Sequence, residues 1–198
     1  THTQPQSTHA DRYNYNFAYG ASAYSKGAVF LAQLGYIMGD DNLKQTLKTY
    51  YKEWAFKHPA PMDFINIAET VSGLNLDWYL IDWTQTTNTI DYGIKSAEID
   101  GETTQITFER IGLMPMPIDF EVEFTDGTKQ QYYIPLRMMR GQKPTSATVL
   151  EVWAWAQPEY SFKVSKPVKS ITIDPMQWMA DVNKENNTID STKINLLK

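Results

Sequence analysis

The sequence predicts an α+β fold, in which an N-terminal antiparallel helical subdomain is followed by an antiparallel β-sandwich of about seven strands. Three observations lead to this prediction. Before Thr87 the apolar residues recur every three or four positions, which is the spacing of a helix with one buried side. After Asn88 they alternate with polar residues, as in a half-buried strand. The predicted helices are joined by about two to five residues, so consecutive helices must turn back on one another.

The first helix is expected between Ser22 and Gly39. The Ser22 side chain can cap the free amides at the start of the helix, and Gly39 can end it. Gly27 lowers the helix propensity but lets another backbone or a long side chain approach closely. The expected buried side consists of Tyr24, Ala28, Leu31, Leu34 and Met38.

Three further helices are expected before Thr87. The second runs over about residues 41–56, with Asp40 or Asp41 as its cap. The third restarts at Pro61, a residue favoured in a first helical turn, and ends at Gly73. Asn75 can cap a short fourth helix that reaches Trp83. The apolar side of the second helix is expected to comprise Leu43, Leu47, Tyr50, Tyr51 and Trp54.

The second half of the chain reads as strands separated by turns. The clearest pair is a strand from Ile118 to Phe124, an Asp126-Gly127 hairpin turn, and a returning strand that ends at Ile134. Further strands are expected over 148–156, 160–165 and 168–174. Trp153 and Trp155 point to the same face of their strand, and we interpret them as core or interdomain packing rather than as a platform for a ligand.

This pattern divides the chain into four parts. Residues 1–12 are a flexible lead-in, residues 13–87 are helical, residues 88–184 form the β-sandwich, and residues 185–198 form a frayed tail. His9 and Asp11 lie in the lead-in, and both side chains can bind a metal ion. Two weak ligands on a mobile segment are more often solvated, so we expect no metal site there.

Composition excludes several classes of function. The formal net charge of -5 is spread evenly, because residues 1–87 carry six basic and eight acidic side chains and the remainder carries twelve and fifteen. A nucleic-acid-binding protein needs a basic face, which this chain lacks. No run of eighteen apolar residues is present to span a membrane. Without cysteine, the chain has neither disulfides nor thiolate zinc sites.

Tyr24 is the most informative polar side chain, and its position fits two interpretations. It can pack its ring into the core and bond its hydroxyl to any nearby carbonyl. It can also present that hydroxyl to a ligand from the first turn of the helix. The residue pattern alone favours the packed tyrosine. The residues around Tyr24 favour the ligand-facing tyrosine instead.

The segment around Tyr24 resembles that of a known family. The chain contains Tyr19, four further residues and then Tyr24-Ser25-Lys26-Gly27, followed by an apolar helix. This order resembles the tyrosine segment of the gluzincin zinc aminopeptidases, the family of aminopeptidase N and the leukotriene hydrolase. Ser25 stands where glutamate is common in that family.

The resemblance continues beyond this segment, over about residues 13–185, and is more specific in its first half. The matching features are Tyr-Tyr-Lys-Glu-Trp at 50–54, FKHPAPMDF at 56–64, a helix end at 68–73, and Leu76-Asp77-Trp78-Tyr79 leading to Trp83. The resemblance implies that residues 13–87 are the helical part of a thermolysin-like catalytic domain. It also implies a parent protein that is a zinc-dependent aminopeptidase, hydrolysing N-terminal peptide bonds.

For the site residues, the resemblance implies that Tyr24 donates a hydrogen bond to the oxyanion of the transition state. Tyr19 would line the same substrate cleft without being essential. Zinc in this family needs an H-E-x-x-H helix and a later glutamate, and the only histidines here are His2, His9 and His58. We therefore expect the zinc ligands to lie upstream in a longer protein. The chain alone is expected to bind no zinc and to be inactive.

The expected partners follow from this interpretation. They are a peptide substrate and the missing upstream zinc subdomain of the parent. Tyr13, Tyr15, Phe17, Tyr19 and Tyr24 would form an aromatic face, at which we expect dimers of the isolated chain. Two alternatives stay open: a non-catalytic helical-plus-sandwich binding module, and a pseudo-peptidase whose zinc motif is broken.

Overall fold

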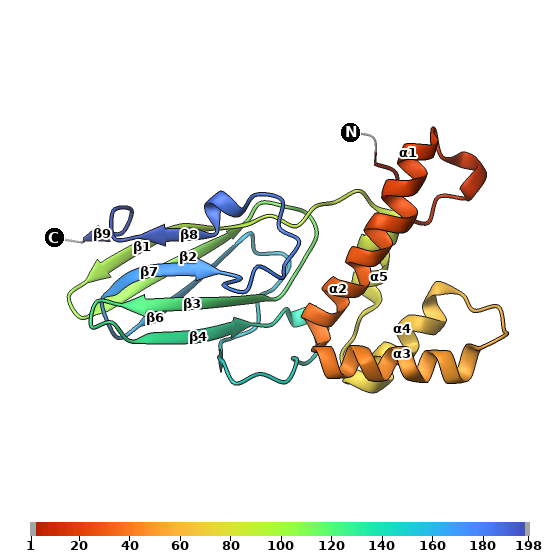
Figure 1. Ribbon diagram of the computed structural model, residues 1–198. Coiled ribbons are helices and arrows are strands. Elements are labelled where there is room, and N and C mark those ends of the chain that lie inside the picture. The colour runs from red at the N-terminus through yellow and green to blue at the C-terminus, as the bar shows by residue number, and fades with distance from the viewer. Residues whose placement is uncertain (1–2, 197–198) are drawn as a thin grey trace. The chain divides into compact units, whose positions relative to one another are not determined.

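A computed structural model describes residues 3–196, which fall into two compact units (Figure 1). The first unit holds the described residues up to Asn88 together with Met138–Pro144. The second holds Thr89–Arg137 and the described residues from Thr145 onward. Helices make up the first unit and two mostly antiparallel sheets make up the second, which confirms the predicted α+β fold. No helix among residues 3–196 is long and apolar enough to cross a membrane.

One short segment departs from the predicted division of the chain. Met138–Pro144 lies within the stretch predicted to be β-sandwich but belongs to the helical unit. Its backbone explains this, because the Asn75 amide donates a hydrogen bond of 2.9 Å to the Met139 carbonyl. Gly141 also lies against the Leu74 side chain. The helical unit therefore includes residues that are distant from it in the sequence.

The first helical segment is longer than predicted. It consists of α1 (Asn16–Tyr19), a π-helical turn η2 (Gly20–Ser25) and α2 (Lys26–Met38), which follow one another without a break. The prediction that Ser22 caps this helix is wrong. The side chain is buried inside the π-helical turn, where its oxygen accepts a hydrogen bond of 3.2 Å from the Gln4 amide. Gly39 ends the segment as predicted, with a φ of 89° that favours glycine.

The buried side of this segment was predicted only in part. Leu34 and Met38 are buried, whereas Tyr24 and Ala28 are exposed. The buried set of α2 is Phe30, Gln33, Leu34, Gly35, Tyr36, Ile37 and Met38. The π-helical turn widens the helix by one residue per turn, so residues before Lys26 point in directions that a regular 3.6-residue period does not give.

The other helices are α3 (Asp40–Trp54), α4 (Pro61–Ser72) and α5 (Asp77–Gln85). α4 starts at Pro61 and ends at Gly73 in the left-handed conformation, as predicted. The predicted caps of α3 and α5 were wrong, because their N-cap residues are Gly39 and Leu76 and neither has a side-chain cap. The predicted apolar side of α3 is only partly covered: Leu47 and Tyr51 are exposed.

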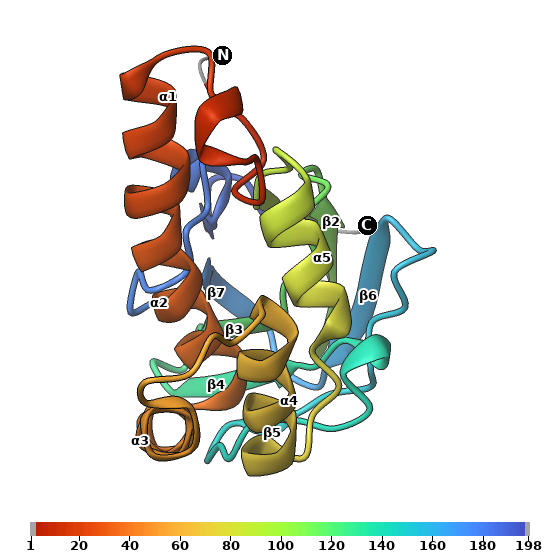
Figure 2. The same ribbon diagram turned by 90° about the vertical axis from the view of Figure 1, so that its right-hand side faces the viewer.

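α2 and α5 lie across from each other in the helical unit (Figure 2), and aromatic side chains of α5 bridge them. Tyr79 of α5 is fully buried, and its hydroxyl donates a hydrogen bond of 2.6 Å to the Phe30 carbonyl of α2. The two rings stack with centroids 4.9 Å apart. The Trp83 indole donates to the Lys26 carbonyl at 3.1 Å. Each aromatic side chain thus buries its ring and satisfies its polar atom in the same contact.

The second unit contains two sheets, with strand orders β6-β2-β1-β9 and β5-β4-β3-β7-β8. The strands are β1 (Tyr92–Asp100), β2 (Thr103–Arg110), β3 (Ile118–Phe124), β4 (Lys129–Ile134), β5 (Thr148–Val149), β6 (Glu159–Val164), β7 (Val168–Ile173), β8 (Thr188–Asp190) and β9 (Asn195–Leu196). All neighbouring pairs are antiparallel except β1–β9 and β4–β5.

The strands of the second unit differ from the prediction in two regions of the chain. The strand expected over 148–156 is reduced to β5. The tail expected to be frayed from residue 185 contains β8 and β9, and Ile189 of β8 is buried opposite Ile171 of β7. A single buried isoleucine in a polar stretch does not predict a strand. β8 forms because its backbone pairs with the edge of β7, which the local sequence cannot indicate.

The core of the second unit is an aromatic cluster between the two sheets. Phe108 of β2 and Phe162 of β6 meet Phe120 of β3, with centroids 4.8 Å apart for Phe108–Phe120 and 5.4 Å apart for Phe120–Phe162. Trp153 is buried beside Tyr92, in agreement with its interpretation as a core residue. Trp155 is only partly buried and lies under the guanidinium of Arg110 at 3.5 Å.

Gly112 marks a close approach of two backbone segments. A Cβ at this position would lie 2.3 Å from the Thr89 carbonyl oxygen and 2.6 Å from the Asp91 nitrogen. Because these are backbone atoms, Gly112→Ala is expected to lower the free energy of unfolding by about 2 kcal/mol or more. Urea unfolding followed by circular dichroism measures the change. Gly20→Ala is the control, since no heavy atom lies within 4 Å of its Cβ position. Equal midpoints for the two variants would contradict the expectation.

Candidate functional site

Three tyrosines form a row that begins just before the first helical segment and ends in its π-helical turn. The rings of Tyr13 and Tyr19 meet edge to face, with centroids 5.3 Å apart. Tyr19 and Tyr24 meet in the same way at 5.5 Å. Tyr24 lies at the end of the row, and 67% of its surface is exposed. The packed interpretation of Tyr24 is therefore wrong, and its side chain is accessible to a ligand.

The hydroxyls of Tyr19 and Tyr24 interact directly. Their hydrogen bond raises the pKa of Tyr19 above its usual value of 10.0, and the nearby Tyr24 charge adds to the shift. Tyr19 therefore keeps its proton at neutral pH. A tyrosine hydroxyl can donate one hydrogen bond and accept others. When the Tyr19 hydroxyl donates to the Tyr24 oxygen, the Tyr24 hydroxyl can still donate its own hydrogen to a ligand.

The π-helical turn aims Tyr24 outward. Such turns are rare and occur often at functional sites. No sequence signal predicted it, because Ala21 and Ala23 are as compatible with a regular helix as with a π-helical turn. The turn is the feature of this site that sequence reasoning missed.

Lys26 anchors the backbone just after Tyr24. Its ammonium donates a hydrogen bond of 2.9 Å to the Thr86 carbonyl and lies 5.5 Å from the centre of the Trp83 ring. Burial lowers the pKa of Lys26. The Trp83 indole bonds the Lys26 carbonyl in return, so both ends of this residue are held by the C-terminal region of α5.

The lead-in contacts both α5 and α2. The Ser7 amide donates to the Thr84 carbonyl at 2.9 Å, and the Tyr13 hydroxyl donates to the Gln6 carbonyl at 3.1 Å. The predicted close approach at Gly27 is made by Gln6, whose Nε2 lies 3.1 Å from the Cβ position. The lead-in therefore contacts the helical unit through Gln6 and Ser7, and its flexibility stays a prediction.

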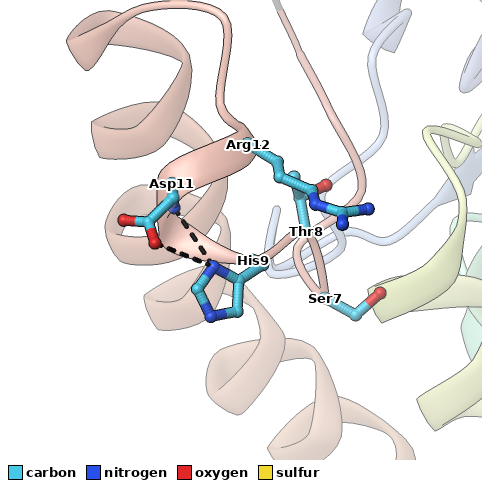
Figure 3. Close-up of a pocket in the computed structure, with 5 residues that line it drawn as sticks. All are labelled: Ser7, Thr8, His9, Asp11 and Arg12. Atoms are coloured by element: carbon cyan, nitrogen blue, oxygen red, sulfur yellow. Dashed lines mark hydrogen bonds and ion pairs between the residues drawn. The ribbon is translucent and has the colours of Figure 1, made fainter.

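A pocket of ≈ 650 Å³ lies in the lead-in, lined by Ser7, Thr8, His9, Asp11 and Arg12 (Figure 3). The Nδ1 atom of His9 accepts a hydrogen bond of 3.3 Å from the Asp11 amide. The Ser7 hydroxyl points away from His9 in Figure 3. The three side chains are therefore not arranged as a serine-hydrolase relay, which needs the serine hydroxyl on the histidine ring.

The described histidines do not form a metal centre. His9 lies in the lead-in and His58 is exposed beyond the end of α3; His2 lies outside the described residues. Within residues 3–196 no three side chains of His, Cys, Asp or Glu lie close enough to hold a metal ion. The residues present therefore do not fit a catalytic zinc site, which requires three protein ligands.

Comparison with protein families identifies the helical part. Residues 2–83 match the peptidase family M1 domain. This segment, the M1 segment below, is similar to peptidase family M1. The predicted resemblance to the zinc aminopeptidases is thereby confirmed, since M1 peptidases are in general zinc-dependent.

A solved structure resembles most of the chain, beyond the M1 segment. The crystal structure of Legionella pneumophila aminopeptidase A in complex with aspartic acid matches 92% of this chain with a TM-score of 0.56 and 12% sequence identity. At that identity the match shows the fold alone. The chain spans 18% of the length of that protein. A search of curated proteins found no match.

Proposed function

We propose that this chain is the part of a zinc-dependent M1 aminopeptidase that supplies the tyrosine for transition-state stabilisation, and that the parent hydrolyses N-terminal peptide bonds. The exposed hydroxyl of Tyr24 carries the proposal. It stands at the end of a π-helical turn in the M1 segment, with Tyr19 bonded to it on one side and Lys26 anchored on the other.

The chemistry of peptide hydrolysis gives Tyr24 its role. When water attacks the scissile carbonyl, negative charge develops on the carbonyl oxygen. A donor placed at that oxygen lowers the barrier because its hydrogen bond strengthens as the charge grows. The phenol of tyrosine suits this task, since its hydroxyl is protonated at neutral pH and its ring is stiff.

Tyr19 has a supporting role in this proposal. Its hydroxyl contacts that of Tyr24 and not the reacting atoms, so it is a positioning residue. The ring contact at 5.5 Å limits the directions in which Tyr24 can point. This goes beyond the sequence-based prediction, in which Tyr19 only lined the cleft.

The zinc ion would be bound by another part of the parent, because the described residues do not fit a zinc site. When bound, zinc activates water and polarises a carbonyl. The exposed aromatic residues Tyr15, Phe17 and Tyr24 support a covering partner on this face, and we assign it to the zinc-binding subdomain of the parent. Pairing of isolated chains at this face stays a prediction.

The test uses the complete protein encoded by the gene. We expect purified protein to contain zinc by mass spectrometry and to release p-nitroaniline from aminoacyl p-nitroanilides. A zinc chelator should abolish the release, and added zinc should restore it. The 198-residue chain alone is the negative control. A zinc-loaded complete protein that hydrolyses none of the aminoacyl reporters would contradict the proposal and indicate a pseudo-peptidase.

A further inference from the structure

Lys26 carries a partly buried ammonium two residues after Tyr24. Among residues 3–196 no carboxylate forms an ion pair with it. Its contacts are the Thr86 carbonyl at 2.9 Å and the Trp83 ring, whose centre lies 5.5 Å away. Burying a charge without a counter-ion costs free energy, and an apolar side chain of similar length would pack here at a lower cost. The charge therefore needs an explanation other than stability.

The acceptor of the Lys26 ammonium is itself held in place. Thr86 follows the last residue of α5, so its carbonyl lies near the end of the helix that carries partial negative charge. The Thr86 hydroxyl donates to the Asp82 carbonyl at 2.5 Å and accepts the Asn88 amide at 3.1 Å. The ammonium is thereby tied to a fixed point at the C-terminus of α5.

Two aromatic residues of α5 hold the start of α2 from the same side. Trp83 donates to the Lys26 carbonyl at 3.1 Å, and Tyr79 donates to the Phe30 carbonyl at 2.6 Å. The two donors are four residues apart on α5, and the two acceptors are four residues apart on α2. Both bonds therefore form at one rotation of α2 about its axis. The ammonium adds a third bond at the residue that joins α2 to the π-helical turn.

The π-helical turn η2 is held by contacts near both of its ends. The Gln4 amide donates to the Ser22 hydroxyl at 3.2 Å inside the turn, and α5 holds Lys26 directly after it. Tyr24 lies between these two points and is 67% exposed. The direction of its hydroxyl therefore depends on the backbone of the turn that carries it.

We propose that Lys26 is a positioning residue for the reaction of the parent, because its ammonium holds the π-helical turn against α5 and so fixes the direction of the Tyr24 hydroxyl. This inference rests on the proposed function, since Lys26 acts through Tyr24. A hydrogen-bond donor lowers the barrier most when its direction is fixed before charge develops on the carbonyl oxygen. Loss of that direction should lower turnover and leave substrate binding nearly unchanged.

A double-mutant cycle in the complete protein tests whether Lys26 acts through Tyr24. Lys26→Met keeps the length of the side chain and removes the ammonium, and we expect kcat to fall about 10- to 100-fold with KM within about twofold. In a Tyr24→Phe background the same change should lower kcat about twofold or less, because no hydroxyl remains to be positioned. Lys26→Arg keeps a donor for the Thr86 carbonyl and should restore most of the turnover. Lys52→Met, at an exposed lysine of α3, is the control and should leave kcat unchanged.

Hydrogen exchange in the 198-residue chain tests the same contact without any peptidase activity. The amides of Gly20–Ser25 should exchange at least about tenfold faster in Lys26→Met than in Lys52→Met, while the amides of α4 stay unchanged. An equal loss of kcat in both backgrounds, or unchanged exchange in the π-helical turn, would overturn the proposal. If the complete protein hydrolyses no aminoacyl reporter, the proposed function fails, and faster exchange in Lys26→Met would still show that Lys26 holds the turn of Tyr24.

Discussion

Replacing Tyr24 by phenylalanine in the complete protein is expected to lower kcat about 100- to 1000-fold with little change in KM, which corresponds to a loss of roughly 3 to 4 kcal/mol of transition-state stabilisation. The substitution removes one hydroxyl and keeps the ring contact with Tyr19. KM should change little because the bond to the carbonyl oxygen strengthens only as charge develops. Steady-state hydrolysis of an aminoacyl p-nitroanilide measures both constants.

Two matched variants show whether the effect belongs to this hydroxyl. Tyr19→Phe removes the positioning contact and should cost less, about tenfold in kcat, because the donor itself remains. Tyr51→Phe changes an exposed tyrosine of α3 and should leave kcat unchanged. If Tyr24→Phe turns over at a near-normal rate while zinc content and circular dichroism are intact, the oxyanion role is wrong.

Phe108→Ala is expected to lower the free energy of unfolding of the second unit by about 3 to 5 kcal/mol. The Phe108 ring is fully buried between the sheets, with Phe120 at 4.8 Å and Phe162 at 5.9 Å. Truncation removes these contacts and leaves a cavity that two paired sheets cannot close. Guanidinium unfolding followed by tryptophan fluorescence measures the loss, since Trp153 reports on this unit.

Ile111→Ala provides the comparison for this prediction. Ile111 is also apolar but 50% exposed, so its truncation should cost less than about 1 kcal/mol. Similar losses for the two variants would mean that the sheets repack around the missing ring.

The sequence by itself determined the fold class and the places where elements stop. The change of apolar period near Thr87 was enough to predict helices followed by sheet. Gly39, Gly73 and the Asp126-Gly127 turn were read correctly because each acts through its own backbone conformation. The order of residues around Tyr24 also sufficed for the family, since a linear motif needs no tertiary information.

Only the tertiary structure decided which way the site residues point. The π-helical turn that exposes Tyr24 depends on contacts from distant residues: Gln4 reaches the buried Ser22, and α5 holds Lys26. The same holds for β8, which exists because β7 offers it an edge, and for the Asn186–Asp91 contact across 95 positions of sequence. A local pattern encodes the backbone conformation of its own residues, whereas the orientation of a side chain depends on partners that only folding brings near.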